Sequence, residues 1–283
     1  MPTTLPPLVD AFEETVRSVI ELGRGCSEAD FARATACPGW TVKDQISHVV
    51  DLESILAGAP EASVDVPDFP HVRNDFGVFM ERGIHARRAV AGPEVVAELE
   101  SVLDQRLAAL RAPGMTAESP VDPGMSIELP VRTAYDLMVL RIRDIWVHEQ
   151  DLRAALGRPG GMGAGGAVVF LDTVFGFLPA LAARRAKVPV GQTVVIEVIG
   201  PVAGECGVRV DPRDDGKPTG VALDATAIEA ARREHADVTW VTLDTESLAR
   251  RAAGRQNVDE TRYAVRGDTA IARAVVDAVV VTP

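Results

Sequence analysis

The spacing of apolar residues changes once along the chain, close to residue 190 of 283. Before that point, apolar residues recur every three or four positions in long runs, which is typical of amphipathic helices. After it, the segments 193–200, 206–212 and 237–244 are short, and they are β-branched or alternate between apolar and polar residues, as strands do. This change predicts a bundle of long helices followed by a small α+β domain.

The clearest linker is the glycine-rich run GRPGGMGAGG, residues 157–166, which lies between the predicted helices 132–156 and 167–186. We expect a helical bundle over residues 1–158, a linker with a bridging helix over 159–186, and an α+β domain over 187–283. The helices predicted from periodicity and capping residues cover 7–23, 28–35, 41–58, 73–91, 94–111, 132–156, 167–186, 225–235, 244–253 and 268–280.

Charge and cysteine content narrow the classes of partner. A net charge of −12 disfavours nucleic acid, because a strongly acidic protein repels the phosphate backbone. No run reaches the roughly 18 uninterrupted apolar residues of a membrane helix, and the first residues lack the pattern of a signal peptide. Three widely spaced cysteines indicate no disulfide framework. We expect a cytoplasmic protein without a membrane partner, either a monomer or a homodimer.

The segment RDIWVHEQDLRAALG carries Asp144, His148 and Asp151 on one face of a predicted helix. Side chains four positions apart project side by side, so Asp144 and His148 suit one metal ion. Asp151 is placed to accept a hydrogen bond from the far ring nitrogen of His148. The alternative is a solvated charged face, because such pairs are common on exposed helices and only weakly stabilising.

His48 is the natural third ligand from a facing helix. It lies on or beside the apolar stripe of the predicted helix 41–58, whereas a lone histidine in such a place is also a common core residue. The other histidines, His71, His85 and His235, lie in a proline-rich loop, a basic segment and a helix end, respectively. For these three we expect exposed or structural roles.

Two stretches together resemble a known family. CPGWTVKDQISHVVDLE, followed much later by DIWVHEQDLRAALGRP, is similar to the mycothiol-dependent maleylpyruvate isomerase family of the DinB-like superfamily of four-helix metal proteins. ADVTWVTLDTESLARRAAGR and YAVRGDTAIARAVVDAVVVTP look like the family's second domain, which is similar to sterol-carrier α+β folds. The resemblance covers most of the chain and implies a DinB-like four-helix bundle followed by a sterol-carrier-like domain.

The resemblance also implies a ligand set and a cosubstrate. The metal ligands fall on His48, Asp144 and His148, with a divalent ion, expected to be zinc, and with mycothiol, the thiol of actinobacteria, as cosubstrate. The family's isomerase typically has Glu where this chain has Asp144, so the ion would lie closer to that backbone. Arg141, one turn earlier, is placed either to bind a carboxylate of substrate or cosubstrate, or to form a surface ion pair.

Two residues of the CPGW turn have open roles. Cys37 is a candidate nucleophile or additional ligand, although most buried single cysteines are small apolar residues. Trp40 is expected to anchor the start of the following helix by packing.

The chemistry implied by the resemblance is attack of a small-molecule thiol on an electrophilic substrate. Addition to an activated double bond, followed by rotation and elimination, gives an isomerase, whereas displacement of a leaving group gives an S-transferase. Two alternatives stay open on the same scaffold: a non-catalytic metal-binding or regulatory protein, and a metal-dependent hydrolase.

Overall fold

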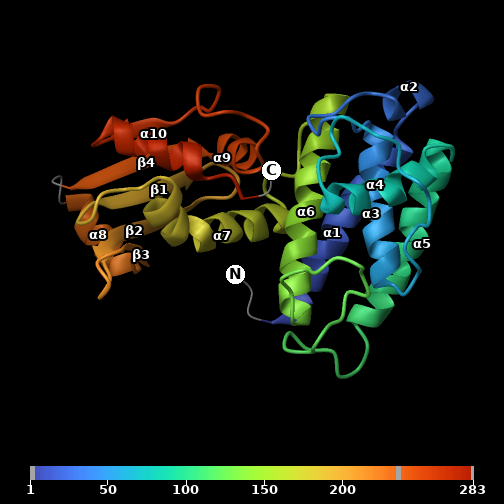
Figure 1. The fold of residues 1–283 in the computed structure, drawn as a ribbon, viewed down its shortest axis with the longest axis horizontal. Coiled ribbons are helices and arrows are strands. Elements are labelled where there is room, and N and C mark those ends of the chain that lie inside the picture. The colour runs from blue at the N-terminus through green and yellow to red at the C-terminus, as the bar shows by residue number, and fades with distance from the viewer. Residues whose placement is uncertain (1–3, 234–236, 282–283) are drawn as a thin grey trace. The chain divides into compact units, whose positions relative to one another are not determined.

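The computed structural model describes residues 4–233 and 237–281, and the chain divides into two compact units, Met1–Gly166 and Ala167–Pro283. The first unit is helical (Figure 1). Its helices are α1 (Leu5–Arg24), α2 (Glu28–Phe31), α3 (Val42–Leu56), α4 (Asp75–Arg87), α5 (Gly92–Leu110) and α6 (Ala134–Leu156).

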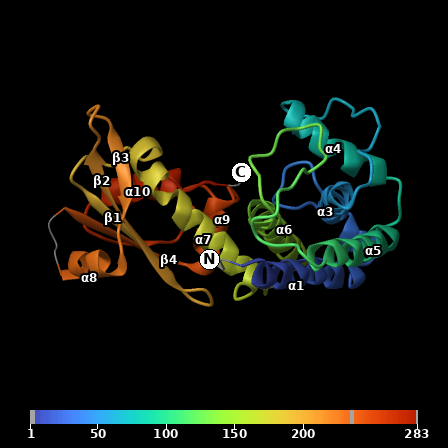
Figure 2. The same cartoon turned by 90° about the horizontal axis from the view of Figure 1, so that it is seen from below.

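The long helices α1, α3, α5 and α6 pack around one core, which confirms the predicted four-helix bundle. Helix α1 packs against α5 and α6, and α3 packs against α5 and α6 while α4 lies along it. Figure 2 shows α1, α5 and α6 alongside one another. Fully buried large side chains such as Phe12, Ile46, Leu99 and Trp146 fill the interior. Burial of such apolar surface is the main force that holds the bundle together.

Capping residues fix where the two central helices begin. In α3 the Thr41 hydroxyl accepts from the backbone N–H of Asp44, whose carboxylate accepts from the backbone N–H of Thr41. Thr133 and Asp136 form the same reciprocal pair at the start of α6. Each cap contributes about 1 kcal/mol. The caps thereby set the rotation and register of the side chains that follow on α3 and α6.

The predicted helix 28–35 is too long. Helix α2 ends at Phe31, and the chain then folds back so that Ala34 pairs with Thr41 in an isolated antiparallel bridge. The capping box of Ser27 and Asp30 starts the helix as expected. The tight return through the CPGW turn stops it, and this return delivers Trp40 directly to the start of α3.

The second unit is a mixed sheet with helices. Its elements are α7 (Gly165–Ala180), the π-helix η1 (Leu181–Arg185), β1 (Thr193–Ile199), β2 (Gly204–Pro212), β3 (Pro218–Ala222), α8 (Ala225–Arg233), β4 (Val238–Asp244), α9 (Thr245–Ala252), β5 (Ala264–Arg266) and α10 (Thr269–Ala278). The strand order is β3-β2-β1-β4-β5, with β1 and β4 parallel and the other pairs antiparallel. The predicted α+β class of this half is confirmed.

Both faces of the central strand are covered. Val195 of β1 lies with Trp240 of β4 and Ile228 of α8 in one core cluster. Val194 and Ile196, which point to the other face, are also buried. Helices α9 and α10 pack against β4, and η1 packs against β2 and β3.

The edge strands β3 and β5 were not predicted from the sequence. Strand β3 begins at Pro218 and contains Gly220, and β5 spans three residues. Proline and glycine are disfavoured in strand interiors, and short edge strands carry too few side chains to show alternation. The local sequence therefore lacks the signal that identified β1, β2 and β4.

The segment Gly165–Arg185 is long and apolar enough to cross a membrane by length and composition alone. A little over half of its most apolar window is buried in the structure. A single helix of this kind is weak evidence for a membrane span, because the core helix of a globular protein meets the same criteria.

Candidate metal centre

Helices α3 and α6 bring three ligand-type side chains together. His48 lies on α3, and Asp144 and His148 lie on α6; each offers one ligand atom, and these atoms all lie within 4.8 Å of one another. The two imidazoles are buried, whereas the side chain of Asp144 is 30% exposed. The cluster therefore faces solvent at the carboxylate and protein at the imidazoles.

Both imidazole nitrogens lie within the distance from the Asp144 carboxylate that separates neighbouring ligands of one small cation. His48 Nε2 lies 3.2 Å from Asp144 Oδ2, and His148 Nε2 lies 3.7 Å from Asp144 Oδ1. Two ligands about 2.1 Å from one ion at a tetrahedral angle are about 3.4 Å apart. Two imidazoles and one carboxylate are also a donor set that zinc, iron and nickel accept. The spacing and the chemistry of these residues are thus compatible with one divalent ion.

Asp144 is connected to a buried network of ion pairs formed by Arg141, Glu53 and Arg106. The Arg141 guanidinium donates through Nη1 to Asp144 Oδ2 at 2.7 Å and through Nε to Glu53 Oε1 at 2.7 Å. Arg106 Nε donates to the other oxygen of Glu53 at 2.8 Å. Burial opposes ionisation of Asp144, but Arg141 and the neighbouring His48 and His148 outweigh it and hold the pKa of Asp144 well below its ordinary value. The ionised form of this carboxylate, the form that binds metal ions, is therefore favoured.

The alternative of a surface ion pair for Arg141 is wrong. The residue is only 3% exposed, and its charge is compensated by buried Glu53 as well as by Asp144. Neither the contact with Asp144 nor the burial was predicted from the sequence, although Asp144 lies only one turn away. Glu53 was missed altogether, because its partner Arg141 is 88 positions away in the sequence. The one local hint is that Glu53 sits among the core residues of α3.

Asp151 lies behind His148, as its position on the helix face suggests. Its Oδ2 is 3.9 Å from His148 Nδ1, which is an ion-pair distance rather than a hydrogen bond. The same oxygen accepts from Gln45 Nε2 of α3 at 3.2 Å, and Gln45 is fully buried. Gln45 therefore holds the carboxylate next to the imidazole across the α3–α6 contact.

Trp40 lies beside the two imidazoles of the cluster. Its ring lies 5.2 Å from that of His48 and 5.8 Å from that of His148, and the two imidazoles are 4.7 Å apart. The half-buried indole thus forms a wall beside both imidazoles. Its Nε1 donates to Glu81 Oε2 of α4 at 3.0 Å, and Glu81 is almost completely buried. This polar anchor fixes the ring in place.

Glu81 also connects the wall to the proline-rich loop. Its Oε2 lies 3.1 Å from His71 Nε2, and its other oxygen pairs with Arg88 at 2.6 Å. The turn before Trp40 can approach His71 only because residue 39 is glycine. Gly39 has φ +80°, and a Cβ there would lie 2.2 Å from His71 Nδ1. This contact gives a structural reason for the glycine of the CPGW turn.

The remaining sequence candidates lie outside the cluster. Cys37 is half-buried and does not belong to the group of ligand-type residues found in the described part of the chain. His71 has the structural role just described, in agreement with the expectation. His85 is half-buried, and its ring centroid lies 6.0 Å from that of Phe69 at a tilted angle of 60°. His235 lies outside the described residues.

Comparison with known proteins gives one family and one kind of fold. The family model described as mycothiol maleylpyruvate isomerase N-terminal domain matches residues 12–153. Two solved structures, of a mycothiol-dependent maleylpyruvate isomerase and of a mutant of that enzyme, are similar to this chain. Each is 15% identical, covers 90% of both chains and has a TM-score of 0.49. No curated protein matches the chain.

Proposed function

The chain belongs to the mycothiol maleylpyruvate isomerase N-terminal domain family, and from that premise we propose that it is a metal-dependent enzyme that uses mycothiol as cosubstrate. The substrate class we propose is a small electrophile, such as an unsaturated acid with an activated double bond. The observation that carries the proposal is the convergence of His48, Asp144 and His148.

In this proposal the three side chains are the ligands of one divalent ion. His48 and His148 bind through Nε2, the nitrogens that face Asp144. Asp144 contributes one carboxylate oxygen while Arg141 holds the other. A bound divalent ion lowers the pKa of a coordinated thiol or water and polarises a carbonyl oxygen. Zinc is the ion we expect, because its borderline character suits both imidazole and thiolate.

Of the three proposed ligands, Asp144 is the most exposed to solvent. The two imidazoles are covered, so substrate and thiol approach from the side of Asp144, which is partly exposed. Trp40 lines this site with an indole that is itself half-buried. Its apolar ring excludes water next to the reacting atoms and offers a surface for a planar, conjugated substrate.

The proposed reaction is addition of the thiol sulfur to one carbon of the double bond. The electron pair of the double bond moves to the conjugated carbonyl oxygen, which leaves a single bond that can rotate. Collapse of that electron pair expels the same thiolate and restores the double bond in the other geometry. The thiol is regenerated, so the step needs no oxidant or reductant. With a substrate that carries a leaving group, the same attack gives a thiol transferase.

Metal analysis of the purified protein tests the ligand assignment. We expect close to one equivalent of a divalent ion in the wild type and a large loss in His48→Ala and in His148→Ala. His85→Ala is the matched control, since this half-buried histidine lies outside the cluster and is expected to leave metal content unchanged. Full metal retention by both ligand variants would contradict the assignment.

A separate assay tests the reaction. Wild-type protein loaded with zinc is incubated with a cis-unsaturated keto acid, with and without mycothiol, and the change in absorbance of the conjugated system is followed. We expect isomerisation that requires both the thiol and an intact His48. Formation of hydrolysis products without any thiol would instead indicate a hydrolase, and binding of metal without turnover would indicate a non-catalytic protein.

A further inference from the structure

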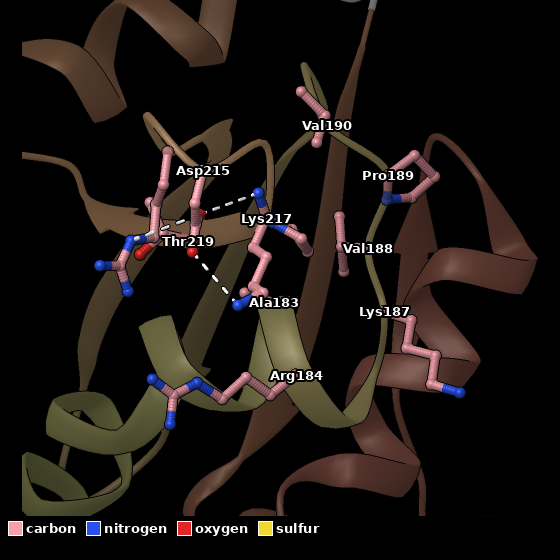
Figure 3. Close-up of a pocket in the computed structure, with 11 residues that line it drawn as sticks. Ala183, Arg184, Lys187, Val188, Pro189, Val190, Asp215, Lys217 and Thr219 are labelled. Atoms are coloured by element: carbon pink, nitrogen blue, oxygen red, sulfur yellow. Dashed lines mark hydrogen bonds and ion pairs between the residues drawn. The ribbon is translucent and has the colours of Figure 1, made fainter.

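The second unit contains a pocket of about 770 Å³ that the proposed function does not use. One wall comes from η1 and the segment after it, and the other comes from the turn between β2 and β3 together with the start of β3 (Figure 3). A volume of this size is in the usual range for small-molecule sites. All its lining residues belong to the unit Ala167–Pro283.

The helical wall has an irregular backbone with an identifiable cause. Pro179 lies inside α7, where it lacks the N–H of a regular helix, and the helix continues as the π-helix η1. Strand β3 approaches this point closely, because a Cβ on Gly220 would lie 2.1 Å from the Pro179 carbonyl oxygen. After η1, Lys187 has φ +52°, a conformation that non-glycine residues rarely adopt. Such strain is frequently found at binding sites.

The lining combines an apolar floor with cationic edges. Ala183 and Val188 are buried at the floor, and Val190 is half exposed. The cationic residues are Arg184, Lys187, Arg213 and Lys217, against a single carboxylate, that of Asp215. The lining residues thus carry a net positive charge, whereas the chain as a whole has a net charge of −12.

The carboxylate of Asp215 is paired with residues of its own turn. Its Oδ1 accepts from the backbone N–H of Lys217 at 3.1 Å, and its Oδ2 lies 3.3 Å from Lys217 Nζ. Arg213 Nε lies 4.0 Å from the same carboxylate. Across the pocket, Arg184 and Lys187 form no ion pair with any residue in the ranges 4–233 and 237–281. The pocket therefore keeps an excess of positive charge above an apolar floor.

From this arrangement we propose that the pocket binds a small organic anion with an apolar body. The floor at Ala183 and Val188 would bury the apolar part, and Arg184 and Lys187 would pair with the carboxylate or sulfonate. The residues that line this pocket lie in the unit Ala167–Pro283, whereas His48, Asp144 and His148 lie in the unit Met1–Gly166.

Binding of octanoate to the full-length protein, followed by displacement of the fluorescent anion anilinonaphthalene sulfonate, tests the proposal. Octanoate is expected to displace the probe, whereas octanol and octylammonium are not. The double variant Arg184→Gln, Lys187→Gln is expected to bind octanoate about tenfold more weakly, since it loses two ion pairs at a partly exposed site. Added salt is expected to weaken binding to the wild type.

Two controls make the result specific. The double variant Arg233→Gln, Arg273→Gln removes the same charge from exposed positions outside the pocket and should bind octanoate as the wild type does. Val190→Glu should weaken binding and Val190→Lys should preserve it, because the side chain is half exposed and lines the pocket. Equal displacement by octanol, or unchanged binding in Arg184→Gln, Lys187→Gln and in Val190→Glu, would overturn the proposal.

Discussion

Arg141 Nη1 donates to Asp144 Oδ2 at 2.7 Å from a position almost completely removed from solvent. The arginine cannot move away freely, because Glu53 holds its Nε and Arg106 in turn holds Glu53. One oxygen of Asp144 is thereby fixed against α6, and the other faces His148. The proposed ligand is thus oriented by a neighbour that does not itself bind metal, a common arrangement in metal proteins.

Replacing Arg141 should therefore weaken metal binding without removing any ligand. We expect Arg141→Met to lower zinc affinity by about 10- to 100-fold, because Asp144 loses the group that orients it and holds its pKa low. Competition with a chromophoric chelator measures this affinity. Arg153→Met is the matched control on the same helix, since Arg153 pairs with Glu149 instead. Unchanged affinity in Arg141→Met would show that the pair has no influence on the site.

The position of Trp40 gives an optical test of where the metal binds. A bound Cu²⁺ ion quenches an indole at contact distance, and Trp40 lies within 6 Å of both imidazole rings. We expect copper to quench part of the tryptophan fluorescence of the wild type. That part should be absent in Trp40→Phe and retained in Trp240→Phe, whose indole belongs to the second unit. Equal quenching in Trp40→Phe would argue for a metal site elsewhere.

Local patterns in the sequence were sufficient for much of the fold. Helices α3 and α6 follow the N-caps Thr41 and Thr133, and each cap precedes an apolar stripe. The buried strands β1 and β4 are β-branched along their length. The edge strand β3 was missed, because it is held by pairing with β2 and by close contact with Pro179 rather than by its own residues.

In the proposed site, too, some residues follow from local sequence patterns and others depend on contacts between helices. Asp144 and His148 follow from helical spacing, which depends on local geometry alone. The roles of Glu53 and Trp40 depend on partners from other helices, Arg141 on α6 and Glu81 on α4. Spacing within one helix contains no information on such contacts.

The ion pair of Glu53 predicts a specific dependence of stability on pH. Burial raises the pKa of this carboxyl, but Arg141 and Arg106 outweigh it and lower the pKa below its ordinary value. A carboxylate with a lowered folded pKa stabilises the protein above its unfolded pKa of about 4.3, and this contribution is lost as the pH falls through the folded pKa. The ionised Glu53 carboxylate therefore stabilises the folded protein at neutral pH.

We expect Glu53→Gln to lower the free energy of unfolding by about 3–5 kcal/mol at pH 7, because two buried arginines lose their shared partner. The difference from the wild type should shrink below about pH 4. Denaturant titrations at several pH values measure it. Glu98→Gln, which breaks a partly exposed pair with Arg87, should cost about 1 kcal/mol or less. A difference for Glu53→Gln that stays constant down to acid pH would contradict the ionised pair.

Lengthening the proposed carboxylate ligand tests how closely the site is built around aspartate. In the wild type, Asp144 contacts Arg141 with one oxygen while both its oxygens lie within 3.7 Å of an imidazole nitrogen. One more methylene group in Asp144→Glu would move the carboxylate past these partners. We expect zinc affinity to fall about tenfold but to stay above that of Asp144→Ala, since a ligand is displaced rather than lost. Chelator competition on the three proteins gives the order. If Asp144→Glu binds zinc more tightly than the wild type, then the ion pair with Arg141 does not make the site favour aspartate over glutamate. If Asp144→Ala binds equally well, then residue 144 is not a ligand.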